Sequence, residues 1–396
     1  MAEIRKSAIP GVVALSVAIG IRQMSMTSVM PFISTYCKSL AGYSAFYAGL
    51  AVGIFGLMQA VFQIPFGVLS DRFGNKRLMM IGLSMVVAGL VLASFAQSVG
   101  VLILARALQG SGAIIGIGYS WAAGMSGEGE RVRAMSILGA FVSAGAALAF
   151  AVGPLLRRIM PVSRMFLTCA CFLFLSELYL LFFVRDEKGD SDRKPGFPNK
   201  KQVGALLSDK NFVMMNLSAF LNNYMMVSVF YAVPIYLTAV TGETGMWKVF
   251  IPAIFIAIFA MKAAVRKFQK GFGRQVLAVS FLVSAWSIPL YFRKTSYAFL
   301  LLGTILFMCG YITVATLTAS SVNEAVEDAC RGTANGIFNS FQYLGNFAGA
   351  AVTGALWGIS EPLTWFVTIG VGLAGFAMML FCKKPRKTVL EEETRR

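Results

Sequence analysis

The feature that most constrains this chain is a series of long apolar segments, each of about 20 residues, separated by short polar stretches. A bilayer core about 30 Å thick is crossed by roughly 20 helical residues, because a helix rises about 1.5 Å per residue. Hydrophobic residues make up 57% of the chain and charged residues 13%, whereas about a quarter of the residues in soluble domains are charged. The sequence therefore predicts an integral membrane protein.

We predict an all-α membrane fold with twelve spans. The segments are continuous and rich in Leu, Ala, Gly and Met, whereas a transmembrane β-barrel shows alternating segments of about ten residues. The first segment extends beyond an ordinary signal peptide and carries Arg22, so we expect it to be a membrane span. The predicted spans are 8–36, 44–70, 78–97, 99–123, 133–157, 162–184, 211–240, 247–266, 275–292, 296–321, 332–358 and 362–382.

The longest polar stretch divides these spans into six and six. It runs from Arg185 to about Lys210 and is dense in charge. We predict an N-terminal six-helix bundle at 1–184, a cytosolic linker at 185–210, a C-terminal six-helix bundle at 211–384 and a cytosolic tail at 385–396. Pseudo-symmetric bundles of this kind usually hold a substrate site between them near the membrane midplane.

Lysine and arginine gather on one side of the predicted topology. Arg5, Arg77 and Lys201 share that side with the tail, and few basic residues fall on the other. Because basic loops stay inside, we predict a multi-pass protein of the cytoplasmic membrane with both termini in the cytosol. This bias explains the net charge of +17, so we do not expect nucleic-acid binding.

The residue inventory excludes several chemistries. The chain has no histidine, and its six cysteines show no paired CxxC spacing, so we expect neither a metal site nor a histidine-based triad. It has no Walker loop and no dinucleotide glycine pattern. We therefore expect no cofactor, no ATP-driven transport and no enzymatic activity, and nothing in the sequence requires more than a monomer.

The segment GVLSDRFGNKR, residues 67–77, resembles the signature loop of the major facilitator superfamily and lies between the second and third predicted spans. The resemblance implies a fold of two six-helix bundles and a gating loop whose Asp caps the start of span eleven, near Gly332 to Ala334. Relatives commonly place an acid at the end of span four, where this chain has Gly124. A plain positive loop is the alternative. The gating residues implied are Gly67, Asp71, Arg72, Gly74, Lys76 and Arg77, and Leu69 also fits the pattern.

Two further segments resemble motifs of the drug:proton antiporter branch. RALQGSGA, residues 106–113, implies that Arg106 supports coupling. Residues 139–154 resemble a motif that ends in Gly-Pro, here Gly153 and Pro154, where the proline bends the helix. Small residues recur every four positions in this span and predict close helix packing, at Gly139, Ser143, Ala147 and Ala151.

Residues 55–76, 106–114 and 331–345 resemble the YajR-like group of proton-driven exporters. Some members of that group carry a soluble C-terminal domain. Because this chain ends soon after its twelfth predicted span, we do not expect such a domain here.

Polar side chains inside the spans are the candidates for substrate binding, because they cannot face lipid cheaply. Positions 335, 339, 342 and 346 follow helical spacing and place amides along one face of span eleven. Cavity lining is one interpretation, and hydrogen bonding between helices is the other. The candidates are Arg22, Gln23, Gln59, Gln109, Asn222, Asn223, Tyr224, Asn335, Asn339, Gln342 and Tyr343.

The predicted spans hold more basic than acidic residues. Arg22, Arg106 and Lys262 stand against Glu177, which is therefore the candidate proton site in a chain without histidine. We predict a carrier that couples protons to the efflux of a small amphipathic organic solute by alternating access. The buried arginines leave open an organic-anion importer or exchanger that needs no proton site, and a ligand-binding sensor without transport is a third possibility.

Overall fold

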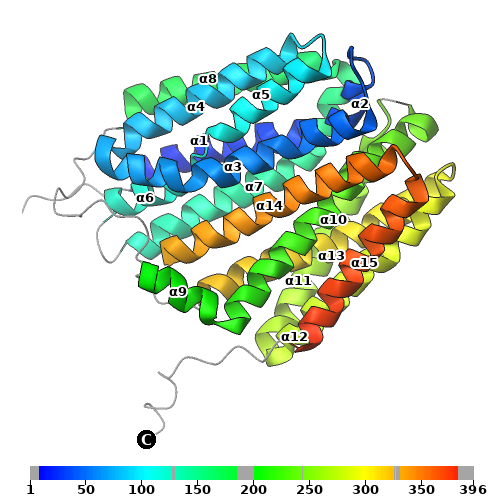
Figure 1. The fold of residues 1–396 in the computed structure, drawn as a ribbon. Coiled ribbons are helices and arrows are strands. Elements are labelled where there is room, and N and C mark those ends of the chain that lie inside the picture. Colours follow the sequence, from blue (N-terminus) through cyan, green and yellow to red (C-terminus); the bar gives the residue numbers. More distant parts are fainter. Residues whose placement is uncertain are drawn as a thin grey trace, which may run out of the picture.

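The computed structural model describes residues 9–126, 130–184, 200–242, 244–324, 326 and 331–381, which form an almost entirely helical bundle (Figure 1). The helices of these residues make the twelve predicted spans. The N-terminal half contains α1 (Ile9–Val29) with η1 (Met30–Phe32) and α2 (Ile33–Cys37), α3 (Ala45–Phe73), α4 (Asn75–Ser94), α5 (Val99–Ser111) with α6 (Ile115–Met125), α7 (Arg131–Ile159) and α8 (Val162–Phe183). The C-terminal half contains α10 (Lys210–Thr241), α11 (Trp247–Lys267), η2 (Phe268–Phe272), α12 (Gly273–Ser287) with η3 (Ile288–Arg293), α13 (Tyr297–Glu324), α14 (Arg331–Trp357) and α15 (Glu361–Phe381).

The spans differ in how apolar they are. By length and hydropathy, ten stretches of the described residues qualify as membrane-crossing, with α11 to η3 counted as one stretch and α14 absent. The amides along α14 lower its mean hydropathy, but α14 packs against α3 and α10 as a span of the bundle. The predicted linker contains a short helix, α9 (Lys200–Ser208).

Local sequence signals set several helix ends. Ser44 and Ser98 cap α3 and α5, since each hydroxyl accepts a hydrogen bond from a backbone N–H three residues on. Gly74 joins α3 to α4 with φ +92°, and Gly271 joins α11 to α12 with φ +91°. Side chains other than glycine are strained in this conformation, so the two halves use the same turn chemistry at corresponding positions.

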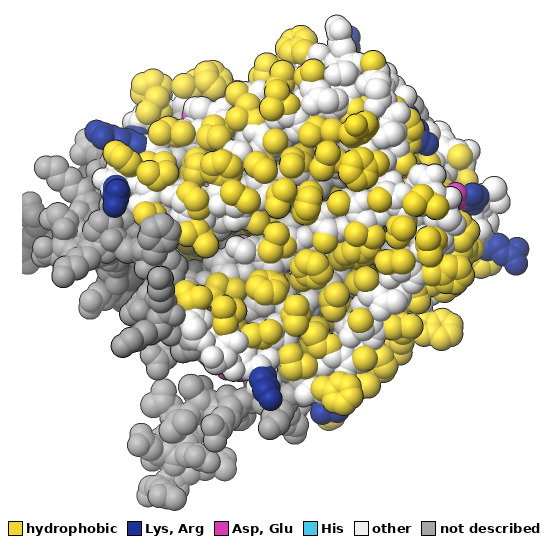
Figure 2. Space-filling view, viewed as in Figure 1, with side chains coloured by type: hydrophobic (Ala, Val, Ile, Leu, Met, Phe, Trp, Pro, Cys, Tyr) yellow, Lys and Arg dark blue, Asp and Glu magenta, His cyan; other side chains and the backbone are white. Residues whose placement is uncertain are grey.

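Large apolar side chains cover the outside of the bundle. Figure 2 shows them across the middle of the visible face, with Lys and Arg side chains towards its ends. Exposed examples include Phe182 on α8 and Phe255 on α11. This distribution suits a protein that is surrounded by lipid at mid-height and by water at both ends.

Close packing between helices depends on glycine. On α7, a Cβ at Gly145 would lie 2.4 Å from Gly20 O, and one at Gly153 would lie 2.4 Å from Ser28 O, both on α1. Of the predicted stripe, Ser143 is exposed and Gly139, Ala147 and Ala151 are half-buried, whereas Gly145 and the predicted Gly153 are buried. Pro154 lies inside α7, which remains one helix.

The two halves meet along α3 and α14, which lie side by side (Figure 1). We call the end of the bundle that carries α2 the α2 end, and the opposite end, which carries α9, the α9 end. At the α2 end Ser34 Oγ donates to Tyr231 O at 2.8 Å, and Tyr231 OH donates to Ala45 O at 3.0 Å. Phe230 of the C-terminal half also stacks on Phe150 of the N-terminal half, with ring centroids 5.1 Å apart. The halves are therefore joined at the α2 end.

Candidate functional site

Two buried arginines share one aromatic ring inside the N-terminal half. The guanidinium carbons of Arg22 on α1 and Arg106 on α5 lie 5.6 Å and 4.7 Å from the centroid of the Phe55 ring on α3. Arg22 is 1% exposed and Arg106 is 2% exposed. Two such cations repel each other and each costs several kcal/mol in hydrocarbon, so the surrounding groups must compensate.

Amide oxygens and the aromatic ring provide part of that compensation. Arg22 Nη2 donates to Gln59 Oε1 at 2.7 Å, and Arg106 Nη1 donates to Gln109 Oε1 at 2.6 Å. The Phe55 ring adds a cation–π contact to each guanidinium. Among the described side chains neither arginine has a carboxylate as a hydrogen-bond or ion-pair partner, so no described acidic group neutralises the pair.

The backbone of span four positions Arg106. A Cβ at Gly110 would lie 2.3 Å from Phe55 O, so the glycine allows α5 to lie directly against α3. Gln109 Nε2 donates to Gly89 O on α4 at 2.9 Å, which fixes the amide that receives Arg106. Span four then breaks between α5 and α6. The predicted motif thus forms a rigid support for one buried cation.

The cluster extends to the C-terminal half through α14. Arg22 interacts with the Tyr343 hydroxyl, across the interface between the halves. Four buried polar atoms here have no hydrogen-bond partner within the described residues: Arg22 Nε, Gln59 Nε2, Gln63 Oε1 and Asn346 Oδ1. Unpaired buried polar atoms are costly, so these atoms are suited to bind a polar ligand or water. We call Arg22, Gln59, Gln63, Tyr343 and Asn346 the central cluster.

Other predicted substrate residues lie apart from these contacts. On α10, Asn223 Nδ2 donates to Ala219 O within its own helix, and Asn222 Nδ2 donates to Tyr311 O on α13. Tyr224 packs closely on Gly349 of α14. Gln23 donates to Thr27 on α1. The remaining α14 candidates are half-buried: Asn335, Asn339 and Gln342.

In the signature loop, Lys76 is hydrogen-bonded to the end of α8. Lys76 Nζ donates to Leu181 O at 2.8 Å and to Val184 O at 2.6 Å. These are among the last carbonyls of α8, where a cation also meets the negative end of the helix dipole. Arg72 and Arg77 are exposed and Gly67 is half-buried. The predicted contact of Asp71 with Gly332 lies outside the described side chains.

The hydrogen-bond partner of Glu177 is a serine and not one of the two buried arginines. Glu177 is 8% exposed and accepts a hydrogen bond of 2.5 Å from Ser84 Oγ on α4, a residue that faces outward. The helices α4 and α8 pack on each other at this point. The geometry brings Arg22, Gln59, Arg106, Gln109 and Tyr343 together and leaves Glu177 with a different partner.

A family model described as the Major Facilitator Superfamily matches residues 15–350. The chain belongs to this superfamily. It is 30% identical over 368 residues to the inner membrane transport protein YajR of Escherichia coli K12, and the match covers 91% of this chain and 79% of YajR. This transporter is also 26% identical over 207 residues to the multi-drug resistance efflux pump PmrA of Streptococcus pneumoniae serotype 4, covering 50% of each chain. A crystal structure of a bacterial homologue of the human lysosomal transporter Spinster, inward-facing and occupied, has a TM-score of 0.74 at 14% identity, over 94% of this chain and 96% of that one.

Phe55 and Tyr119 also belong to the site, although the sequence did not mark them as candidates. Phe55 lies four residues before Gln59 and eight before Gln63, so the three share one face of α3. That spacing could have identified the ring as part of the polar face. Tyr119 on α6 interacts with Tyr343, and its position after the break in span four carried no comparable signal.

This member of the superfamily is a multi-pass membrane carrier and not an enzyme.

Proposed function

We propose that this transporter exports a small amphipathic organic solute by alternating access and couples the export to proton entry. One observation carries the proposal: the central cluster lies at the interface of two halves that are joined at the α2 end. A solute held there contacts both halves, so its binding free energy can bias their rearrangement. The relationship to YajR and PmrA supports transport, and the relationship to PmrA, an efflux pump, supports the outward direction.

The proposed orientation in the membrane follows from the distribution of the basic residues. The signature loop and the predicted tail lie on the basic side, so both termini are placed in the cytosol and the α2 end faces the opposite compartment. In this orientation the halves are joined on the outer side. A solute from the cytosol would then enter the central cluster before the outer contacts separate.

A second candidate function is transport of an organic anion without a protein proton site. The arginine pair favours it, because a buried positive cluster with no described carboxylate partner attracts an anionic group. Glu177 is engaged with Ser84 and not with the arginines, which also favours a solute that carries its own charge. The two candidates share Arg22 as the substrate contact and differ in whether protons move.

Flux in proteoliposomes distinguishes the two candidates. Purified protein is reconstituted with a pH-sensitive dye inside, a pH gradient is imposed, and salicylate, norfloxacin or ethidium is added as an anionic, zwitterionic or cationic probe. Proton movement triggered by a probe supports antiport. Movement of salicylate without a proton signal supports the second candidate, and no movement of any probe contradicts both.

A matched pair of variants tests the site itself. Arg22→Gln removes the charge from the central cluster, whereas Lys262→Gln removes a cation from an exposed position on α11 that contacts Phe259. We expect Arg22→Gln to weaken salicylate binding by about tenfold or more, because a charge-assisted hydrogen bond is lost. Lys262→Gln is expected to bind as the wild type does. Equal affinity in Arg22→Gln would remove this residue from the site.

A further inference from the structure

The unpaired polar atoms of the central cluster form a pattern of hydrogen-bond donors and acceptors. Arg22 Nε and Gln59 Nε2 carry hydrogens and can only donate, whereas Gln63 Oε1 and Asn346 Oδ1 can only accept. These four buried atoms have no hydrogen-bond partner within the described residues. The orientation of the Gln59 amide is fixed, because its oxygen accepts from Arg22 Nη2, which can only donate. A ligand that satisfies the cluster therefore both accepts and donates hydrogen bonds.

The two unpaired donors belong to neighbouring side chains. Arg22 and Gln59 are joined by the hydrogen bond of 2.7 Å between Nη2 and Oε1. The guanidinium carries a positive charge, and among the described side chains no carboxylate bonds to it. Charge-assisted hydrogen bonds to a carboxylate are stronger than bonds between neutral groups. This part of the cluster is therefore suited to the two oxygens of one carboxylate.

The two unpaired acceptors lie on either side of these donors along α3. Gly56, Gln59 and Gln63 share one face of α3, since they are spaced by three and four residues. Asn346 lies beside Gly56, because a Cβ on that glycine would be 3.1 Å from Asn346 Cβ. A helix rises about 1.5 Å per residue, so the backbone of Gly56 lies about 4.5 Å, and that of Gln63 about 6 Å, from Gln59 along the helix axis. An acceptor is thus available about one helical turn from the donors in each direction.

From this pattern we propose that the transported solute carries a carboxylate and, about one helical turn away from it, an ammonium or hydroxyl group. The carboxylate accepts from Arg22 and Gln59, and the second group donates to Gln63 Oε1 or Asn346 Oδ1. A solute with a carboxylate alone leaves both acceptors unpaired, which is costly. Because the central cluster is taken as the substrate site, this assignment rests on the proposed function, and it narrows the solute to acids that carry a separate donor group.

Calorimetry on the purified full-length protein tests the pattern with four small probes. 5-Aminovalerate carries a carboxylate and an ammonium at the two ends of a chain that spans about one helical turn. Valerate lacks the ammonium, pentylamine lacks the carboxylate, and free glycine holds the two groups close together. We expect 5-aminovalerate to bind at least about tenfold more tightly than valerate or free glycine, and pentylamine not to bind. Equal affinity for 5-aminovalerate and valerate overturns the proposal, as does the absence of 5-aminovalerate binding at millimolar concentrations.

Two variants remove the acceptors one at a time. Gln63→Leu and Asn346→Leu each replace an amide by an apolar side chain of similar size. We expect one of them to lower the affinity for 5-aminovalerate to that for valerate while valerate binding, which also reports folding, stays unchanged. Gln275→Leu makes the same kind of change at an exposed position on α12 and should bind both probes as the wild type does. A preference for 5-aminovalerate that survives in both acceptor variants overturns the assignment, as does an equal loss for both probes.

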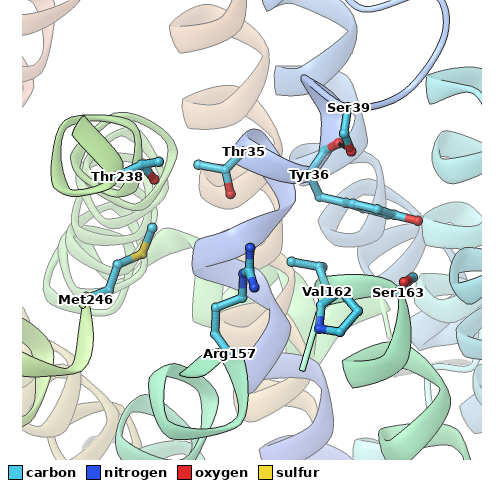
Figure 3. A pocket seen from close by; sticks show the side chains of 9 residues that line it. Thr35, Tyr36, Ser39, Arg157, Val162, Ser163, Thr238 and Met246 are labelled. Atoms are coloured by element: carbon cyan, nitrogen blue, oxygen red, sulfur yellow. Dashed lines mark hydrogen bonds between the residues drawn. The ribbon is translucent and has the colours of Figure 1, made fainter. Parts of the chain in front are cut away.

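A separate cavity provides a control for the place of binding. A space of about 290 Å³ at the α2 end has walls from both halves, among them Thr35 on α2 and Thr238 on α10 (Figure 3). The residues of the four unpaired atoms do not line it. Thr238→Val removes a hydroxyl from this cavity and should leave 5-aminovalerate binding unchanged. If Thr238→Val weakens binding as much as the acceptor variants do, the probe occupies the cavity at the α2 end and the proposal fails.

Binding by calorimetry and flux in proteoliposomes separate the class of solute from transport itself. If salicylate, norfloxacin or ethidium moves across the membrane but 5-aminovalerate binds no better than valerate, the solute class is wrong and transport stands. If 5-aminovalerate binds with the expected pattern but neither it nor any other probe moves, the proposed function fails and the ligand pattern of the central cluster stands.

Discussion

Under the proposed alternating access, closure of the α2 end should depend on the close approach of α3 and α14, and one added methyl group should weaken it. A Cβ at Gly49 would lie 2.4 Å from Ala350 O and 2.7 Å from Gly354 Cα. Both neighbours are backbone atoms, which cannot rotate away as a side chain can. Gly49→Ala therefore requires the two helices to move apart at this point.

The size of the effect follows from what differs between the conformations. Overpacking of a tight contact costs about 1–3 kcal/mol. The gain in helix propensity of about 1 kcal/mol from Gly to Ala applies whether the halves are joined or separated, so it cancels. When the halves separate, the clash disappears. The equilibrium should shift away from the closed α2 end by roughly 5- to 150-fold.

The Cβ position of Gly358 on the C-terminal half lies 3.6 Å from Ala45 Cβ on the N-terminal half, within the range for a disulfide, so an Ala45→Cys, Gly358→Cys pair measures this shift as the extent of disulfide formation. We expect cross-linking to fall sharply when Gly49→Ala is added to the pair. Gly370→Ala on α15 is the control, because a Cβ there meets nothing within 4 Å, and its cross-linking should match that of the parent. Undiminished cross-linking with Gly49→Ala would show that the α3–α14 contact does not govern closure, and the reasoning would fail.

Three further predictions address the charged residues. Glu177→Gln is expected to abolish the pH dependence of flux in proteoliposomes, and a wild-type pH profile rejects Glu177 as the proton site. Asp71→Asn should leave substrate affinity unchanged but slow turnover several-fold, measured as binding and flux on the same preparation, and full turnover contradicts a gating role. Lys76→Met removes two hydrogen bonds to α8 and should destabilise the protein by about 1 kcal/mol in thermal melts. Arg77→Met changes an exposed position and should leave the melting temperature unchanged. Equal melting temperatures of the two variants argue against a stabilising role of the Lys76 hydrogen bonds.

The spans themselves were predictable from the sequence because each is long and apolar, and their order follows from chain connectivity. The twelve predicted segments correspond to the twelve spans of the described residues. Details that depend on neighbouring helices were not predictable. Spacing of four residues predicted a packing stripe through Ser143, but Ser143 is exposed, and the glycines of α7 that lie against the α1 backbone are Gly145 and Gly153.

In the candidate site, too, the burial of the residues was predictable from the sequence, whereas their contacts were not. The sequence predicts that buried polar residues such as Arg22 and Gln59 avoid lipid, and the structure places them in contact. It does not predict which amide receives which arginine, because that depends on how three helices cross. Glu177 illustrates the limit: its burial is predictable from the hydropathy of its span, whereas its bond to Ser84 depends on the contact between α4 and α8.

Arg22 is one of the residues through which the two halves interact electrostatically, since it belongs to α1 and interacts with Tyr343 of α14. Its bond to Gln59 lies within the N-terminal half, whereas its interaction with Tyr343 crosses the interface. Separation of the halves would leave a buried cation with fewer partners, which is costly. A solute that offers an acceptor to Arg22 compensates for the lost hydroxyl. Under the proposed mechanism, substrate binding thus lowers the cost of the conformational change, and an acceptor group on the solute is the chemical requirement for transport.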